Sequence, residues 1–185
     1  MKETIMKEAQ GKTIDWNAEP WFQPLCEIVG NENIITKFAE RMAYGRDRWP
    51  CANLKYRFGK FPGPEPFLVT VPGTYEEVAE VVKLANKYII PLVPYGLGSG
   101  GAGGALPVPN GITIDLKRLN NLLEIDKISG LATAQAGMNG EYFEAELNKR
   151  RLTLGHFPQS LTISSVGGWL ACRSAGQASS RYGKI

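Results

Sequence analysis

The sequence predicts an α+β or α/β fold with mixed strands, and three features indicate it. Residues 67–71 and 89–95 are short apolar runs that flank an amphipathic segment at residues 74–88, the pattern of a strand–helix–strand unit. Residues 112–136 contain further short runs rich in strand-forming residues. A helical pattern follows at residues 139–150. Helices and strands are therefore expected together in this part of the chain.

The composition is that of an ordinary globular protein. The 185 residues are 43% hydrophobic and 21% charged, and their number corresponds to about one domain. The 21 Lys and Arg against 18 Asp and Glu leave a net charge of +3 without a basic block, which gives no electrostatic reason to expect nucleic acid or a membrane surface as partner. No apolar stretch approaches the roughly 20 residues of a membrane span, and the N-terminus lacks the apolar region of a signal peptide. Three cysteines without CxxC or metal-type spacing indicate a reduced, cytoplasmic compartment and no metal site.

Residues 1–66 are interpreted as a helical and irregular arm that precedes the main domain at residues 67–185. Two short helices are predicted in it, at residues 19–30 and 32–44, from the helical spacing of apolar side chains. The following stretch at residues 49–66 contains four prolines and is predicted to be irregular.

The strand–helix–strand unit carries specific helix signals. Thr74 and Glu77 have the spacing of a capping box. The apolar positions that predict the buried face of this helix are Val78, Val81, Val82 and Ala85. The unit has the length of about 30 residues that a parallel crossover needs, so its two strands are predicted to be parallel.

The remaining elements are predicted from shorter patterns. The predicted strands cover residues 112–116, where apolar and polar residues alternate, then 122–126, 131–136 and, briefly, 152–154. Residues 127–130 are predicted to be a turn. Asn139 is the predicted N-cap of a helix that runs through Arg150, and another helix is predicted near Val166.

A glycine loop follows the second strand of the unit. Six of the nine residues at 96–104 are glycine. Glycines let a ligand approach the backbone, and successive exposed amides form a donor array that suits a phosphate or pyrophosphate. The alternative is a flexible linker, but a linker is unusual directly after a strand of such a unit.

This loop differs from two known phosphate loops. Gly98, Gly100 and Gly103 fit the pattern G-x-G-x-x-G, whose dinucleotide-binding form requires a helix to begin in the loop. Pro107 and Pro109 exclude a helix there. No Gly-Lys-Ser/Thr follows, so a Walker loop is excluded as well. A nicotinamide-binding Rossmann domain is therefore disfavoured.

A second constellation lies at residues 155–169. It combines four hydroxyl side chains and a Gly-Gly pair in a loop that leads to the helix predicted near Val166. Hydroxyls and free amides at a helix start can bind a ligand, which favours a second wall of the same cofactor site. The alternative is a structural cluster of Ser/Thr turns. His156, the only histidine, is interpreted as structural, since no metal-type spacing surrounds it.

These motifs resemble those of a flavoenzyme superfamily. Residues 94–100, Pro-Tyr-Gly-Leu-Gly-Ser-Gly, resemble the P-x-G-x-G-[ST]-x flavin loop of the vanillyl-alcohol oxidase/p-cresol methylhydroxylase superfamily. Residues 155–176 resemble the alkyl-dihydroxyacetone-phosphate synthase branch. The glycolate and D-lactate dehydrogenase branch is similar across residues 67–137. The resemblance spans about residues 66–185.

The resemblance implies an FAD-binding domain of the p-cresol methylhydroxylase type (PCMH type), built from two α/β subdomains with the flavin between them and incomplete at the C-terminus. It implies cofactor-binding roles for Pro94, Tyr95, Gly96, Leu97, Gly98, Ser99 and Gly100, for Pro158, Gln159, Ser160, Leu161, Thr162, Ile163 and Ser164, and for Gly167, Gly168, Cys172, Arg173, Ser174 and Ala175. Family members continue beyond the position of Ile185, where most of their catalytic groups lie, so no catalytic residue is assigned. The chain is interpreted as a fragment, a split subunit or a truncated product.

The implied function is that of an FAD-dependent oxidoreductase, in which a 2-hydroxy acid or similar small alcohol gives a hydride to flavin N5. One alternative is a flavin transferase like alkyl-dihydroxyacetone-phosphate synthase, without net redox change. Another is a non-catalytic flavin-binding subunit that needs a partner chain. We expect an oligomer, with the substrate bound through a C-terminal portion or another subunit. Ser99 stands where covalent members often carry a histidine, so FAD is expected to bind non-covalently.

Overall fold

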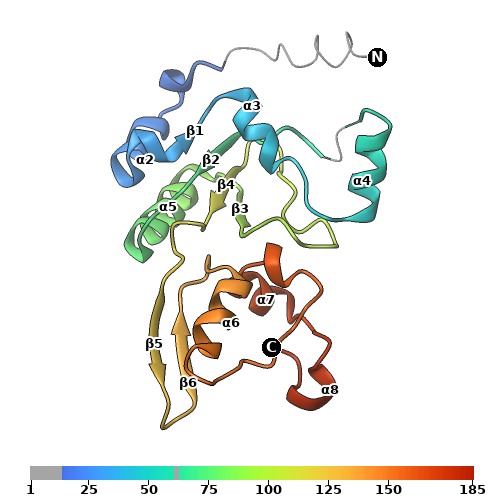
Figure 1. Cartoon of the computed structure of the whole chain (residues 1–185). Coiled ribbons are helices and arrows are strands. Elements are labelled where there is room, and N and C mark those ends of the chain that lie inside the picture. Colours follow the sequence, from blue (N-terminus) through green and yellow to red (C-terminus); the bar gives the residue numbers. More distant parts are fainter. Residues whose placement is uncertain (1–13, 61–62) are drawn as a thin grey trace. The chain divides into compact units, whose positions relative to one another are not determined.

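The computed structural model describes residues 14–60 and 63–185 (Figure 1). The described chain forms two compact units. Unit 1 contains the described residues up to Tyr95 together with Gly100–Asp115, and unit 2 contains Gly96–Ser99 together with Leu116–Ile185. The predicted mixture of helices and strands is confirmed. No helix among the described residues combines the length and the apolar character that a membrane crossing requires.

Unit 1 contains a four-stranded sheet. Its strands, in spatial order, are β1 (Ile34–Ile35), β2 (Leu68–Thr70), β4 (Ile112–Asp115) and β3 (Leu92–Tyr95). β2, β4 and β3 are parallel, so the predicted parallel crossover from β2 to β3 is confirmed. β4 lies between these two strands in the sheet. All four residues of β4 are buried, since a central parallel strand is covered on both faces. The alternation at residues 112–116 therefore does not correspond to one exposed face.

The crossover helix α5 (Tyr75–Tyr88) begins and packs much as predicted. Thr74 Oγ1 accepts the N–H of Glu77 at 3.1 Å, as in a capping box. The Glu77 carboxylate instead accepts the N–H of Gly73, at 2.6 Å. The buried residues of the helix are Val81, Leu84 and Ala85, whereas Val82, predicted on the apolar face, is exposed.

The helix predicted at residues 32–44 is wrong. This segment forms η2 (Asn31–Asn33), β1, the short α3 (Phe38–Arg41) and η3 (Met42–Tyr44). Ile34 and Ile35 pair antiparallel with β2, because the edge of β2 offers backbone groups that need partners. The sheet thus outweighs the local helical pattern.

The other N-terminal elements agree in part with the prediction. η1 (Trp16–Ala18) precedes α2 (Phe22–Val29), which lies inside the helix predicted at residues 19–30. The stretch at 49–66, predicted to be irregular, contains α4 (Pro50–Arg57). Pro50 is tolerated because it stands at the start of the helix, where an N–H has no helical partner.

Unit 2 contains the predicted hairpin and helix. β5 (Leu122–Asp126) and β6 (Leu131–Ala134) pair antiparallel around the predicted turn. α6 (Gly140–Asn148) lies beside the hairpin (Figure 1). Asn139 caps this helix as predicted, because its side chain accepts the N–H groups of Glu141 and Tyr142 at 2.9 and 3.2 Å.

The end of the chain packs onto the same core. α7 (Val166–Cys172) is the helix predicted near Val166, while η4 (Leu161–Ile163) and α8 (Ser179–Tyr182) were not predicted. The buried cluster consists of Met138, Phe143, Leu147 and Trp169. The strand predicted at residues 152–154 is wrong: Leu152 and Leu154 pack against this cluster, and the N–H of Leu154 binds the Glu144 carboxylate at 3.1 Å instead of a neighbouring strand.

Candidate cofactor-binding site

The glycine loop leaves its backbone donors unused. It starts where Pro94 and Tyr95 end β3, and no helix follows it, as predicted. Among the described residues, no acceptor takes a backbone N–H of residues 97–104. Gly98 and Gly103 have φ angles of 66° and 81°, values that glycine adopts without strain. A Cβ at Gly101 or Gly104 would meet no atom within 4 Å, so the backbone at both positions is open to a ligand.

The start of this loop packs against the second constellation, within unit 2. A Cβ on Gly96 would overlap Ser165 Oγ, so a larger residue here would force the Ser165 side chain to move. Ser165 is the N-cap of α7, and its Oγ accepts the N–H of Gly168 at 3.3 Å. Two segments that the sequence predicts to form one site therefore meet in the structure.

The later part of the loop is held within unit 1 by a segment for which no functional role is predicted from sequence. The N–H of Arg48 donates to the carbonyl of Gly100 at 2.9 Å. A Cβ on Gly103 would lie 3.4 Å from the ring of Trp49. No local sequence signal points to this support, because it joins residues about fifty positions apart.

Several polar groups of the second constellation are already used. The hydroxyl of Ser164 donates to the carbonyl of Ser160 at 2.6 Å and accepts the indole N–H of Trp169 at 2.7 Å. The N–H of Val166 donates to Met138, and that of Gly167 to Ala136. The expectation of free amides at this helix start is therefore wrong, since α7 begins against the strand–helix connection of unit 2.

Other groups of this constellation remain available. Pro158 is buried, and Leu161 packs against the buried cluster of unit 2, whereas Ile163 is 41% exposed. The side chains of Gln159, Ser160 and Thr162 make no hydrogen bond with any described residue; Gln159 and Thr162 are exposed, and Ser160 is half-buried. A ligand at this segment would thus meet one amide side chain and two hydroxyls.

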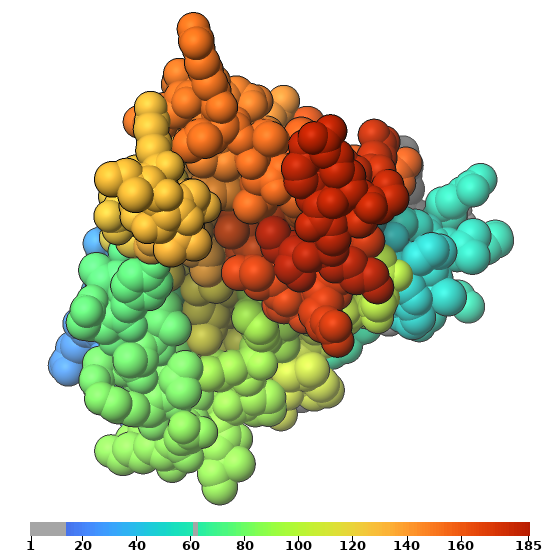
Figure 2. All heavy atoms as spheres, turned by 90° about the horizontal axis from the view of Figure 1, so that it is seen from below, coloured from blue at the N-terminus to red at the C-terminus, as the bar shows by residue number. Residues whose placement is uncertain are grey.

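The segment after α7 turns sharply. Arg173 adopts the left-handed conformation, with φ 48°, and the N–H of Ser174 donates to the carbonyl of Trp169 at 3.0 Å. This arrangement is a common way to end a helix. Cys172, Arg173 and Ala175 are exposed, and Figure 2 shows the red C-terminal segment at the surface of unit 2.

His156 lies beneath this segment. It is 3% exposed, its ring packs edge-on against Trp169 at 4.8 Å, and its Nε2 lies 2.6 Å from Ser174 Oγ. Nδ1 has no hydrogen-bond partner among the described residues. Burial lowers the pKa of His156 below its ordinary value of 6.5, because desolvation disfavours the charged ring.

The free energy of unfolding should therefore fall as the pH is lowered from 7.5 to 5.5. The exposed histidine of the unfolded chain binds a proton more readily than the buried one, so stability is complete above about pH 6.5 and declines below it. Urea denaturation at a series of pH values measures this. Because His156 is the only histidine, His156→Gln should flatten the dependence in this range. An equally steep dependence in the variant would contradict this explanation.

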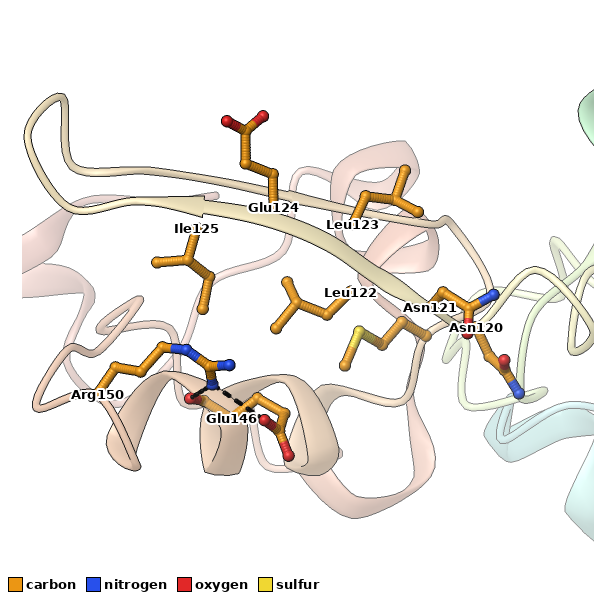
Figure 3. A pocket seen from close by; sticks show the side chains of 9 residues that line it. Asn120, Asn121, Leu122, Leu123, Glu124, Ile125, Glu146 and Arg150 are labelled. Carbon is orange, nitrogen blue, oxygen red and sulfur yellow. Dashed lines mark hydrogen bonds and ion pairs between the residues drawn. The ribbon is translucent and has the colours of Figure 1, made fainter.

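A separate hollow opens between β5 and α6 (Figure 3). It has a volume of about 520 Å³ and is lined by Asn120, Asn121, Leu122, Leu123, Glu124, Ile125, Met138, Glu146 and Arg150. Leu122 and Ile125 point toward α6, and Arg150 pairs with Glu146 at 3.0 Å. No predicted cofactor-binding residue lines it. It contains no histidine or cysteine, and among the described residues no cluster of His, Cys, Asp and Glu could hold a metal ion.

Residues 66–185 match a protein family described as the FAD binding domain. Among curated proteins, the chain is 40% identical over 123 residues to alkyldihydroxyacetonephosphate synthase of Dictyostelium discoideum, covering 65% of this chain and 20% of that protein. It is 34% identical over 169 residues to an uncharacterised FAD-linked oxidoreductase of Escherichia coli K12, covering 87% and 33%. It is 27% identical over 161 residues to a glycolate oxidase subunit of Bacillus subtilis, covering 87% and 32%.

Solved structures give a consistent result. An alkyldihydroxyacetonephosphate synthase superposes with a TM-score of 0.83 at 32% identity, covering 89% of this chain and 31% of the other. p-Cresol methylhydroxylase superposes with a TM-score of 0.70 at 22% identity, again covering 89% and 31%, which shows a shared fold. The chain thus spans between a fifth and a third of the length of these relatives.

Proposed function

Because the chain belongs to the FAD binding domain family, we propose that residues 94–104 hold the pyrophosphate of FAD in a flavin-dependent oxidoreductase. The observation that carries this proposal is the run of backbone N–H groups at residues 97–104 that find no acceptor in the described part of the chain. A pyrophosphate presents several anionic oxygens close together, and a run of free amides supplies several donors to such a group. The open backbone at Gly101 and Gly104 leaves room for such a group.

The chain's own residues would bind FAD and orient it. The hydroxyl of Ser99 adds a donor to the loop amides, and Gln159, Ser160 and Thr162 supply polar groups from the second constellation. Ser174, whose hydroxyl lies against His156, is a further candidate. FAD, when bound, supplies an acceptor for a hydride at its N5 atom. The relative described as an FAD-linked oxidoreductase supports redox chemistry on FAD. The glycolate oxidase subunit supports a 2-hydroxy acid or similar small alcohol as the hydride donor.

A second candidate has specific support. The relative with 40% identity and the structure with a TM-score of 0.83 are both alkyldihydroxyacetonephosphate synthases. This similarity favours a flavin-dependent transferase, in which the flavin shows no net reduction.

One experiment separates the two. Full-length protein loaded with FAD is mixed without oxygen with glycolate, D-lactate and related hydroxy acids, and in parallel with an acyl-dihydroxyacetone phosphate. Bleaching of the flavin absorbance by a hydroxy acid supports the oxidoreductase. Release of fatty acid without bleaching supports the transferase. If FAD is bound but neither bleaching nor release of fatty acid is observed, both candidate functions are contradicted.

FAD should be held without a covalent bond to the glycine loop. Ser99 has no ring nitrogen that could form a histidyl–flavin bond, and the only histidine, His156, is buried in unit 2. After acid precipitation of the flavin-loaded protein, the yellow colour should stay in the supernatant. Colour in the pellet would contradict this prediction.

A further inference from the structure

Asp47 has an unusual carboxylate. The residue is 2% exposed, and its Oδ1 accepts the N–H of Trp49 at 2.9 Å. Its other oxygen, Oδ2, is buried and has no hydrogen-bond partner among the described residues. A buried acceptor without a partner is destabilising, and few occur in folded proteins. This oxygen is therefore expected to gain a partner in the functional state.

The unpartnered oxygen lies beside unpartnered donors. Within unit 1, Asp47 Oδ2 is 3.6 Å from the position that a Cβ of Gly100 would occupy. The adjacent Arg48 holds the carbonyl of Gly100 through its N–H at 2.9 Å, which fixes this part of the loop against the Asp47 segment. The N–H groups of Gly100 and Gly101 donate no hydrogen bond to a described residue. The backbone of the loop at Gly100 therefore lies close to the unpartnered carboxylate oxygen.

We propose that Asp47 is a positioning residue for the glycine loop, and that its Oδ2 accepts the N–H of Gly100 or Gly101 when the loop closes on FAD. This inference rests on the proposed function. A carboxylate beside a pyrophosphate would repel it, unless a loop amide lies between them and binds the carboxylate. Asp47 would thereby turn the N–H of Gly100 or Gly101 toward its own carboxylate, and the amides of residues 97–99 would bind the phosphates.

A purely electrostatic role of Asp47 would change FAD affinity in the opposite direction. If Asp47 acted on the anionic cofactor only through its charge, its removal would tighten FAD binding, because a source of repulsion would be lost. If it positions the loop, its removal weakens binding, because the loop amides lose their orientation before the ligand arrives.

The test compares FAD affinity, from flavin fluorescence titrations, of wild type, Asp47→Ala, Asp47→Asn and Asp126→Ala. Asp47→Ala should bind FAD about tenfold more weakly, the effect of losing one hydrogen bond to a charged group. Asp47→Asn keeps the volume and one acceptor oxygen, so a loss of about threefold is expected. Asp126→Ala is the matched control: its carboxylate also accepts backbone N–H groups, from Ile128 and Ser129, in the hairpin turn of unit 2. It should bind FAD like wild type.

Hydrogen exchange in the FAD-bound protein adds a local measurement. In Asp47→Ala, exchange should become faster at residues 100–102, whereas the hairpin at residues 122–134 should keep its wild-type exchange. A general loss of stability would accelerate exchange in both places.

The outcomes distinguish failure of the Asp47 inference from failure of the proposed function. Unchanged or tighter FAD binding by Asp47→Ala, with wild type binding FAD, overturns the inference alone. Failure of wild type to bind FAD overturns the proposed function and this inference with it. If Asp47→Ala does not fold, Asp47→Asn decides: affinity equal to wild type with unchanged exchange at residues 100–102 overturns the inference.

Discussion

Gly98→Val should weaken FAD binding by roughly tenfold or more, whereas Gly63→Val should leave it unchanged. Gly98 has a φ of 66°, which a β-branched residue adopts only with strain on the order of 1–3 kcal/mol. The valine side chain would also cover neighbouring N–H groups that are unused in the structure. Strain and lost donors act together, and about 1.4 kcal/mol corresponds to a tenfold change in affinity.

Gly63 is a suitable control. It lies outside the glycine loop, and a Cβ there would make an ordinary contact of 3.7 Å with the carbonyl of Pro107. FAD titration of both variants, with circular dichroism to verify folding, measures the difference. Equal affinity of the two folded variants would contradict the assignment of the pyrophosphate to this loop.

Gly96→Ala should destabilise the protein by about 1–3 kcal/mol, because its Cβ would overlap Ser165 Oγ. Ser165→Ala should cost about 1 kcal/mol through the lost helix cap on α7. In the double variant the overlapping oxygen is gone, since the Ser165 Cβ is 3.4 Å from the built Cβ of Gly96. The combined loss should therefore be at least about 1 kcal/mol smaller than the sum of the single losses.

Urea denaturation of the four proteins completes this cycle. FAD affinity should follow the same order, because the contact joins the glycine loop to the second constellation. Additive effects, within about 0.5 kcal/mol, would show that Gly96 and Ser165 do not touch in solution.

The elements that the sequence predicts well are those with strong local signals. α5 has a capping threonine and apolar residues at helical spacing, and α6 has Asn139 at its start. The two strands of the β5–β6 hairpin are connected by a four-residue turn at residues 127–130. In each case the residues that determine the element lie within it or next to it.

The wrong secondary-structure predictions lie where contacts with residues far away in the sequence determine the local conformation. Ile34 and Ile35 have helical neighbours in sequence, but they complete the edge of β2, more than thirty residues away. Leu152 and Leu154 resemble a strand, but they serve the buried cluster of unit 2. Local patterns carry no information on either contact.

The candidate site shows the same division. The glycine loop is evident from composition alone, and the structure adds that the N–H groups of residues 97–104 donate to no described residue. The roles of Asp47, Arg48 and Trp49 could not be predicted, because they depend on contacts with Gly100 and Gly103 across the fold of unit 1. The amides at the start of α7 were expected to be free, but Met138 and Ala136 accept two of them.

Amide hydrogen exchange with and without FAD tests the central claim most directly. The N–H groups of residues 97–104 have no acceptor among the described residues, so they should exchange rapidly in the FAD-free protein. Saturating FAD should slow exchange in a peptide covering these residues, while the β5–β6 hairpin tip at residues 127–130 stays unchanged. Binding of FAD without any protection of residues 97–104 would contradict the claim that this loop holds the cofactor.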